Sequence, residues 1–415
     1  MTTDSSSLYA ALLGLKAPWA IEDVEMKSEA GEVHIRVALP KGERWVCPEC
    51  LAAAPIHDHQ DRTWRHLDTC QFKTLVHARV PRLNCPTHGI KQLSVPWAEP
   101  GSQFTALFEA LAIDWLSQAS VSAVAKQLRI SWDQASGIME RAVRRGLLRR
   151  ESEVVRHVGV DETSFTRGHA YVTVVADLER SRVLYVADDR TKASLDGYWA
   201  GLSHEHLLAI EAVAMDMYAP YIQSTLLHVP FADERIVFDK FHIAQILNKA
   251  VDQVRRMENR RLGAEGDHSL TGTKFDWLRH PASFTRAARQ EFEELRERVH
   301  RMARAWELKE TAMAIFDLRA AWAARRNFTR WFAWAIRSQL DPMKNVARTL
   351  LRYWDQIENY FRHRVTNAGL EAVNTKIQQV KRRSRGFRSR ERFKMAIYCH
   401  CGGLDLYPAG AAIRH

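Results

Sequence analysis

Two short motifs rich in metal-binding side chains constrain this sequence more than any other feature. Cys47-Pro-Glu-Cys50 is a C-x-x-C pair, and Cys85-Pro-Thr-His88 is a C-x-x-H pair farther along the chain. Each spacing brings two ligands onto one tight turn, so the two turns together offer three thiolates and one imidazole. The sequence therefore predicts a closed, structural Zn²⁺ site, because no ligand position is left for a substrate. Two unrelated pairs of buried thiols are the alternative.

The length and composition set the broad class of protein. A chain of 415 residues exceeds one ordinary domain, and 46% hydrophobic residues can build a sizeable core, so we expect several folded domains. No apolar run reaches the roughly 18 residues of a membrane helix, and the first residues do not have the pattern of a secretory signal. We expect a cytoplasmic protein without membrane contact, whose six cysteines are thiols or metal ligands.

The positive charge of the chain is concentrated in one place. There are 60 Lys and Arg against 49 Asp and Glu, a formal net charge of +11. Most of this excess lies in KIQQVKRRSRGFRSRERFK, residues 376–394, which contain nine basic side chains and one acidic side chain. A local basic segment of this kind indicates an anionic partner, with nucleic acid the first candidate.

The pattern along the chain changes four times, which predicts a multidomain fold. A hairpin-like stretch at 21–39 precedes the cysteine motifs, three short helices follow Gly101, and strands then alternate with helices from Val154. A long block with helical spacing follows. The predicted domains are an N-terminal hairpin and zinc-binding domain, an all-α helix-turn-helix domain, an α/β core, an all-α insertion, and a final basic part of the core, at residues 1–95, 100–150, 151–240, 241–365 and 366–415.

The three short helices have the spacing of a helix-turn-helix. Ser120 and Ser131 stand where N-caps are wanted, and small or apolar residues such as Val124 recur at the positions that would face the last helix. An ordinary helical bundle shares this periodicity and stays open as the alternative. If the segment binds DNA, the side chains offered by the last helix are Trp132, Gln134, Arg141, Arg144 and Arg145.

Three carboxylates occupy positions that suit metal-dependent phosphoryl transfer. Asp161 ends the strand in HVGVDETSF, Asp216 ends the strand in AIEAVAMDMY, and Glu371 lies on a helix-like stretch just before the basic segment. Carboxylates at strand ends face the crevice of an open α/β sheet, and three of them can hold two Mg²⁺ ions. The alternative is that they are turn, cap or surface residues. Competing acids are Glu162, Asp188, Asp189 and Asp239.

Taken in order, these motifs resemble the bacterial insertion-sequence transposases of the ISL-three group. The most specific parts of the resemblance are Asp239-Lys240-Phe241-His242 and the later Glu-x-x-Asn-x-x-Ile block with its KRR and GFR. The resemblance implies a ribonuclease-H-like catalytic domain with a DDE triad, interrupted by a helical insertion. Matched residue by residue, the triad falls on Asp161, Asp216 and Glu371.

This resemblance implies a function and its partners. The chain would be a DDE transposase that cleaves the ends of an insertion sequence and joins them to target DNA, with two Mg²⁺ or Mn²⁺ ions per site and one structural Zn²⁺. Its partners would be double-stranded DNA, at the terminal repeats and at the target, and a second copy in a homodimer or larger assembly. It would act at the bacterial nucleoid. A zinc and helix-turn-helix transcriptional regulator and a structure-specific nuclease remain the alternatives.

The basic segment and the pair Asp239 and His242 are two further groups expected to act beside this triad. We expect the basic segment to be folded, because Val380, Phe387 and Phe393 interrupt its charges, although a solvated helix or a disordered tail is the alternative. Asp239 and His242 are hypothesised to support the site, with His242 positioning a phosphate or a water, or else to form a structural junction. The expected phosphate contacts are Lys381, Arg382, Arg383, Arg385 and Arg388.

Overall fold

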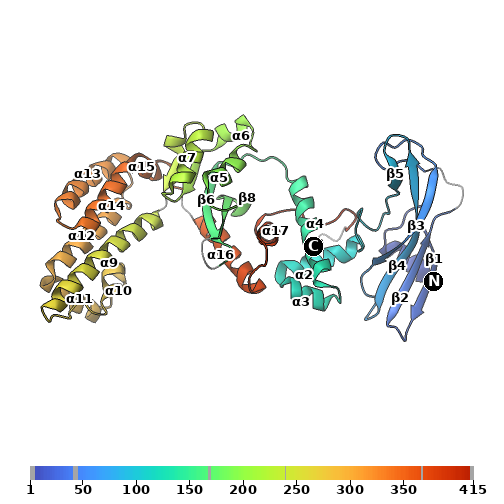
Figure 1. The fold of residues 1–415 in the computed structure, drawn as a ribbon, viewed down its shortest axis with the longest axis horizontal. Helices are drawn as coiled ribbons and strands as arrows, with labels where there is room; N and C mark the ends of the chain where they lie inside the picture. Colours follow the sequence, from blue (N-terminus) through green and yellow to red (C-terminus); the bar gives the residue numbers. More distant parts are fainter. Residues whose placement is uncertain (1–4, 41–44, 167–169, 239, 366–367, 412–415) are drawn as a thin grey trace. The chain divides into compact units, whose positions relative to one another are not determined.

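The chain forms two compact units in a computed structural model that describes residues 5–40, 45–166, 170–238, 240–365 and 368–411 (Figure 1). The first unit contains residues 1–151, 380–385 and 395–415, and the second contains residues 152–379 and 386–394. The predicted C-terminal segment 366–415 is therefore divided between the two units. Within the described ranges, no helix is both long enough and apolar enough to cross a membrane.

A five-stranded sheet begins the first unit. The strands follow helix α1 (Ser5–Leu12) and pair in the order β1-β2-β4-β3, with β5 on the far part of β4. The predicted hairpin is present, because β1 and β2 pair antiparallel around Gly31, whose φ of +65° suits glycine. Trp19, Trp64 and Trp97 are buried against one another in the core of this part. The strands are β1 (Ala20–Lys27), β2 (Glu32–Ala38), β3 (Ile56–Arg65), β4 (Lys73–Cys85) and β5 (Gly89–Gln92).

The three predicted helices follow this sheet. They are α2 (Ala106–Gln118), α3 (Val121–Gln127) and α4 (Trp132–Arg149). Ser120 and Ser131 are the N-caps of α3 and α4, as predicted, and Ser131 forms a reciprocal capping box with Gln134. Val124 and Ile138 are buried between the helices. The helices therefore begin where the sequence places the hydroxyl caps.

A mixed sheet forms the centre of the second unit, as the order of strands and helices predicts. Its strand order is β10-β9-β6-β7-β8, in which β7 is antiparallel to β6 and β8, while β9 and β10 run parallel to β6. The strands are β6 (His157–Ser164), β7 (Tyr171–Asp177), β8 (Arg182–Asp188), β9 (Ala212–Met215) and β10 (Ile236–Phe238). The helices between them are α5 (Lys192–Trp199), α6 (His204–Ala209), α7 (Ala219–His228) and α8 (Ala232–Arg235).

The predicted all-helical block lies between β10 and the C-terminal helices, and Figure 1 shows it as one bundle, coloured yellow to orange. One hydrophobic cluster runs from the sheet, at Val158, into these helices, as far as Phe361. Asn359 joins the two parts directly, because its Nδ2 donates hydrogen bonds to the carbonyl oxygens of Asp233 and Ile236. The helices are α9 (Lys240–Ala264), α10 (Lys274–Leu278), α11 (Arg286–Arg298), α12 (His300–Ile315), α13 (Ala321–Arg337), α14 (Asp341–Arg352) and α15 (Trp354–His363).

Two helices end the chain, α16 (Ala368–Ser384) and α17 (Arg390–Cys401). The first part of α16 packs closely on the sheet of the second unit. A Cβ atom added to Gly369 would lie 2.4 Å from the carbonyl oxygen of Leu178, and one added to Gly159 would lie 3.3 Å from Leu370. Gly369 lets the backbone of α16 approach Leu178, directly after β7, and Gly159 leaves room on β6 for the side chain of Leu370.

Candidate functional site

The register of two parallel strands brings Asp161 and Asp216 together. Gly159 of β6 pairs with Ala214 of β9, and each aspartate stands two residues farther along its own strand direction. Because side chains two residues apart point to the same face, both carboxylates emerge at the same level, on strands roughly 4.8 Å apart. The ligand oxygens of Asp161, Glu162 and Asp216 all lie within 4.8 Å of one another, and we call these three residues the acid cluster.

The surroundings of Asp161 change its acidity. Burial raises the pKa of Asp161 to about 6, and the nearby charge of Asp216 adds to this effect. Two donors oppose it, because the backbone N–H of Glu162 and Nδ2 of Asn374 donate hydrogen bonds of 2.8 and 2.6 Å to the Asp161 carboxylate. A carboxylate pair of this kind is best stabilised by a cation, which would offset both the burial and the repulsion.

Asn374 offers one further oxygen at this place. While its Nδ2 contacts Asp161, its Oδ1 is buried and has no hydrogen-bond partner among the described residues. A buried amide oxygen without a partner is costly unless a water or an ion completes it. The acid cluster and Asn374 together therefore match the oxygen ligands that Mg²⁺ prefers.

Glu371 lies on the same helix as Asn374, one turn earlier. Its side chain is exposed, and it is not a member of the acid cluster. Helix α16 follows β6 closely, because Asn374 contacts Asp161 and Gln378 Nε2 donates to Thr163 Oγ1 at 3.1 Å. Residues three apart share a helix face, so Glu371 and Asn374 lie on the same side of α16. The structure thus brings two members of the predicted triad together and puts the third on the adjacent helix.

Two other side chains hold the cluster from outside. His242, in the first turn of α9, places its Nδ1 2.5 Å from Asp216 Oδ1. Arg190 Nη1 lies 3.0 Å from Glu162 Oε1, and its guanidinium lies over the ring of Tyr218. His242 was expected near the site, and the pairing with Asp216 agrees with that expectation, while its role stays a proposal. Asp239 lies outside the described residues.

The two cysteine motifs converge as predicted. Cys50 Sγ lies 3.6 Å from Cys85 Sγ, and His88 Nδ1 lies 3.6 Å from Cys85 Sγ and 3.8 Å from Cys47 Sγ. Four ligands around one Zn²⁺ ion at 2.0–2.3 Å would be about 3.5–3.8 Å apart, so these separations suit a tetrahedral site. Backbone N–H groups of Cys50 and Glu49 lower the pKa of the Cys47 thiol, which favours the thiolate that zinc binds.

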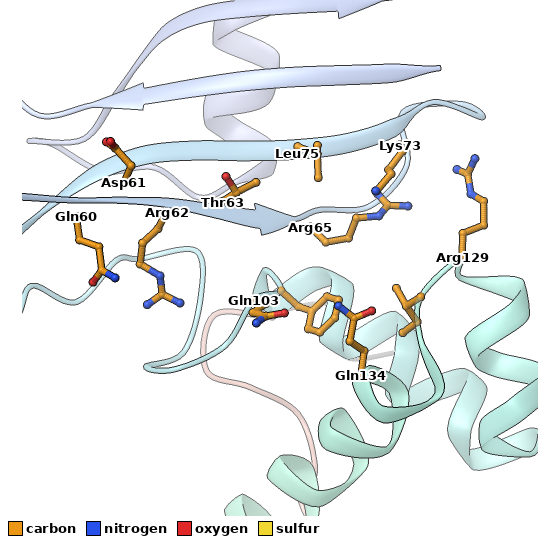
Figure 2. Close-up of a pocket in the computed structure, with 12 residues that line it drawn as sticks. Gln60, Asp61, Arg62, Thr63, Arg65, Lys73, Leu75, Gln103, Arg129 and Gln134 are labelled. Atoms are coloured by element: carbon orange, nitrogen blue, oxygen red, sulfur yellow. The ribbon is translucent and has the colours of Figure 1, made fainter. Parts of the chain in front are cut away.

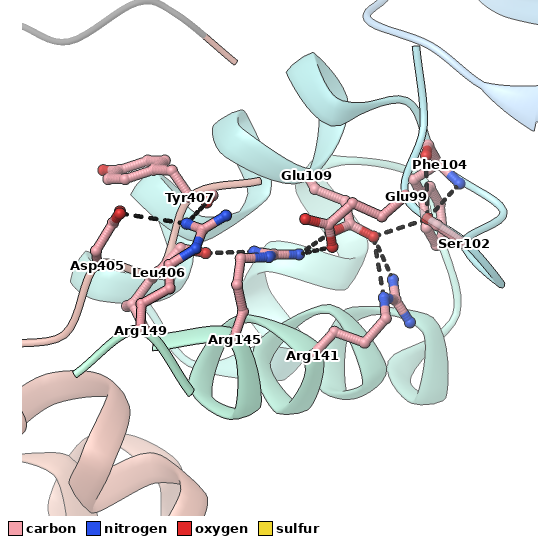
Figure 3. Close-up of polar contacts among 10 residues, drawn as sticks. All are labelled: Glu99, Ser102, Phe104, Glu109, Arg141, Arg145, Arg149, Asp405, Leu406 and Tyr407. Carbon is pink, nitrogen blue, oxygen red and sulfur yellow. Dashed lines mark hydrogen bonds and ion pairs between the residues drawn. The ribbon is translucent and has the colours of Figure 1, made fainter. Parts of the chain in front are cut away.

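Two arginines predicted to bind DNA have a different role (Figure 3). Arg145 is only 8% exposed and contacts the carboxylates of Glu99 and Glu109 and the carbonyl oxygen of Leu406. Arg141 places Nη2 2.5 Å from Glu109 Oε1. The prediction that Arg141 and Arg145 face DNA is therefore wrong in this structure, because a buried carboxylate, Glu109, binds both guanidinium groups.

The remaining predicted side chains of α4 stay on the surface. Trp132 is 37% exposed at the start of the helix, and Gln134 follows it in the same turn. Arg144 is exposed and forms only a surface ion pair with Glu140 one turn earlier. In a helix-turn-helix, the first turns of the last helix contact base edges, so Trp132 and Gln134 have the appropriate position.

Comparison with known proteins gives family profiles that match the cysteine motifs, the three-helix segment and the region that contains the acid cluster. A family profile described as "Transposase" matches residues 158–397, which is more than half of the chain. The chain belongs to the ISL3 family of transposases. A profile described as "Helix-turn-helix domain of transposase family ISL3" matches residues 93–143, and a zinc-finger profile of transposases IS204, IS1001, IS1096 and IS1165 matches residues 43–88.

Two curated relatives cover nearly the whole of this transposase. The "Transposase for insertion sequence element IS1557" of Mycobacterium tuberculosis is 28% identical over 413 residues, which is 92% of each chain. The "Transposase for insertion sequence element IS1001" of Bordetella parapertussis is 24% identical over 385 residues, 91% of this chain and 94% of the relative. The resemblance stated from the motifs is thus confirmed at the level of the family.

A basic groove beside α4 was not expected from the sequence of this transposase (Figure 2). It has a volume of about 380 Å³ and lies between strands β3 and β4 and the turn that precedes α4. Arg129, in that turn, pairs with Asp68 and donates a 3.1 Å hydrogen bond to the carbonyl oxygen of Gln71. The sheet and the helix-turn-helix therefore form one continuous surface. The groove is lined by polar and basic side chains, among them Gln60, Arg62, Thr63, Arg65, Lys73, Gln103, Arg129 and Gln134.

The basic segment of the transposase is folded, as expected. Val380 and Phe393 are buried, and Phe387 packs on Phe393 with ring centroids 5.1 Å apart. Arg383 donates a hydrogen bond of 3.1 Å to the carbonyl oxygen of Ser117, and burial lowers the pKa of Lys381. The exposed side chains that stay available for phosphates are Arg382, Arg385 and Arg388.

Removing one zinc ligand is expected to remove the metal. Cys50→Ser should lower the zinc content from about one ion per chain to near zero and lower the melting temperature, because structural zinc contributes folding free energy directly. Metal analysis of the purified protein and thermal unfolding measure both effects. Cys70→Ser is the control, since Cys70 is exposed and lies outside the cluster. A Cys50→Ser variant that retains its zinc would contradict the assignment.

Proposed function

We propose that this transposase cleaves DNA at the ends of an insertion sequence and joins those ends to target DNA at the acid cluster. The observation that carries the proposal is the closeness of Asp161 and Asp216 on neighbouring parallel strands. Asp161 lies within β6, which continues to Ser164 rather than ending at Asp161 as the sequence predicted, and Asp216 directly follows β9. The names of the two relatives, both transposases of insertion sequence elements, support the same reaction. We also propose a ribonuclease-H-like fold, which the mixed sheet with its three antiparallel and two parallel strands supports.

The proposed metal ligands are Asp161, Asp216 and Glu371. The half-buried Asp161, the repulsion between the two aspartates and the amide oxygen of Asn374 without a described partner all favour a bound cation. Two Mg²⁺ or Mn²⁺ ions held there would activate the attacking oxygen and stabilise the leaving oxygen of a phosphodiester. Glu371 would complete the ligand set from α16, the helix that Asn374 fixes against β6.

Several neighbouring residues would hold the side chains of these proposed ligands in a fixed orientation. Asn374 and the N–H of Glu162 hold the Asp161 carboxylate in one orientation, since they donate to its two different oxygens. His242 Nδ1 lies 2.5 Å from Asp216 Oδ1, and Arg190 pairs with Glu162. Such supporting contacts keep reactive groups in place, and their loss typically costs roughly 10- to 100-fold in metal affinity or activity. His242 would thus be a positioning residue.

DNA binding would be divided between two surfaces. Arg382, Arg385 and Arg388, which follow Glu371 in the chain, would contact phosphates independently of sequence and with strong salt dependence. Trp132 and Gln134, with the basic groove beside α4, would select the terminal repeats of the element. Competition between element-end duplex and random duplex for the protein measures this selectivity, and equal affinity for both would refute the second assignment.

One assay separates the proposed function from its alternatives. Purified protein is incubated with labelled element-end DNA and a target plasmid, with and without Mg²⁺. We expect joined products only with Mg²⁺, because the reaction requires the cation at the acid cluster. A transcriptional regulator would bind the DNA in both conditions and give no product, and a nuclease would cut without joining. We expect the active form to be a homodimer or larger, since two element ends must be held together.

A further inference from the structure

Helix α13 carries aromatic and basic side chains on its exposed face. Trp322, Arg326, Arg330 and Trp334 follow one another at intervals of four residues, so they form a row roughly 18 Å long on one side of the helix. Trp322 is 71% exposed and Trp334 is 37% exposed. The core does not need them, because the opposite face packs through other residues, namely Ala324, Phe328, Trp331 and Ala335.

Most of the positive charge of α13 has no acidic partner among the residues that the structure describes. Helix α13 contains four arginines and no acidic residue. Arg325 contacts Glu358 and Asp355, whereas the other three make no ion pair with any residue that the structure describes. Residues 321–352, which include α14, contain seven basic side chains and one acidic side chain. The three arginines without an ion pair are Arg326, Arg330 and Arg337.

Helix α11 of the same bundle shows that an arginine-rich helix without acidic residues is not the rule in this protein. Helix α11 also has four arginines, but it has four glutamates among them, and its Arg296 contacts both Glu293 and Glu307. The bundle therefore contains one helix whose arginines are balanced by glutamates and one helix without acidic residues. The excess at 376–394 is not the only local concentration of positive charge.

We infer that the exposed face of α13 is an additional DNA-binding surface, which holds the backbone of the DNA on which the transposase acts. Arginine guanidinium groups bind phosphates, and indole rings can pack against the sugars of the DNA backbone without regard to sequence, so the combination suits sequence-tolerant DNA binding. A second copy of this same face is a poor occupant, because a two-fold contact would set unneutralised arginines against each other. The inference rests on the proposed function.

The surface belongs to the same unit as the acid cluster. Phe328 of α13 stacks on Trp354 of α15 with ring centroids 3.7 Å apart. Asn359 of α15 in turn donates to the carbonyl oxygen of Ile236 in β10, which pairs with β9 just before Asp216. DNA held on α13 would therefore be bound by the same folded unit that carries the reactive carboxylates.

The test is binding of a labelled random-sequence duplex to the full-length protein, without added Mg²⁺, at several salt concentrations. The variant Arg326→Gln/Arg330→Gln/Arg337→Gln is expected to raise the Kd at least tenfold and to reduce the slope of log affinity against log salt by about 2.7. A second variant, Trp322→Ala/Trp334→Ala, should weaken binding at least threefold with the slope unchanged. Thermal unfolding checks that both variants are folded.

The matched control removes the same charge from α11 with Arg286→Gln/Arg289→Gln/Arg298→Gln and should leave the Kd within twofold. Wild-type affinity in the α13 arginine variant, or an equal loss in the control, would overturn the inference. A change in oligomeric mass without a change in DNA affinity would instead assign the face to protein contact. Failure of the proposed function is seen separately, as wild-type protein that binds DNA and gives no joined product.

Discussion

Replacing Asp161 or Asp216 by asparagine is expected to abolish strand cleavage and joining while DNA affinity stays within twofold of wild type. Each substitution keeps the size of the side chain and removes the charge that a cation needs at the acid cluster. Losses on the order of a thousandfold or more are reasonable for an interaction made with the transition state. Gel assays of cleavage and joining measure the loss, and equilibrium binding in the absence of Mg²⁺ measures the affinity.

Asp341→Asn is the matched control for these variants. Its side chain is 80% exposed and pairs on the surface with Lys344, one turn along α14, so the change should leave cleavage unaffected. Retained cleavage in Asp161→Asn or Asp216→Asn would remove that residue from the reaction centre.

The third ligand can be decided by comparing Glu371→Gln with Glu162→Gln. We expect Glu371→Gln to reduce cleavage at least a hundredfold and Glu162→Gln less than tenfold, because Arg190 already neutralises Glu162 at 3.0 Å. The opposite order would show that the acid cluster itself provides the third ligand, as its geometry allows.

The acidity of Asp161 adds a pH-dependent signature. Because burial raises its pKa to about 6 in the metal-free protein, the carboxyl takes up a proton as the pH falls through about 6, and a cation must compete with that proton below this pH. The same shift means that the ionised form destabilises the fold above pH 6. Asp161→Asn is therefore expected to raise the melting temperature of the metal-free protein at pH 7.5. The gain in the free energy of unfolding should be at most about 3 kcal/mol at pH 7.5 and smaller at pH 5. An unchanged melting temperature would contradict the burial argument.

Replacing Arg145 by alanine is expected to destabilise the first unit strongly. The guanidinium lies in a buried network with Glu109, which is 1% exposed, and Glu99 (Figure 3). Removing one partner leaves a buried carboxylate with fewer counter-charges, which costs about 3–5 kcal/mol. Arg141 still contacts Glu109, so we expect the lower end of this range and a fall in melting temperature of roughly 6–12 °C.

The same substitution should release the C-terminal segment. Arg145 donates to the carbonyl oxygen of Leu406, and Arg149 donates to that of Tyr407 at 2.6 Å. Residues 402–408 are therefore held on α4 by side-chain donors, and limited proteolysis should cut this segment earlier in the Arg145→Ala variant.

The neighbouring residue provides the control. Arg144 is 69% exposed and pairs only with Glu140 on the surface, so Arg144→Ala should cost less than about 1 kcal/mol. If Arg145→Ala instead lost DNA affinity with an unchanged melting temperature, the internal role of Arg145 would be wrong, and the role first expected from the sequence would be restored.

The comparison of Arg144 with Arg145 shows where prediction from the sequence ends. Both arginines lie on a helix that the sequence predicts, with its N-cap at the correct serine. Adjacent residues on a helix point about 100° apart, so one of them faces solvent and the other faces Glu109, 36 residues earlier in the chain.

The sequence by itself determined the features that depend on short-range spacing. Ligand spacing in two knuckles determined the Cys47, Cys50, Cys85 and His88 cluster, and serine caps determined the starts of α3 and α4. Apolar runs determined the strand that contains Asp161 and the strand that ends before Asp216. Only the tertiary structure decided which partners meet across long distances in the chain. It joined Asn374 to Asp161, His242 to Asp216 and Arg145 to Leu406, because such contacts depend on how whole elements pack rather than on local periodicity.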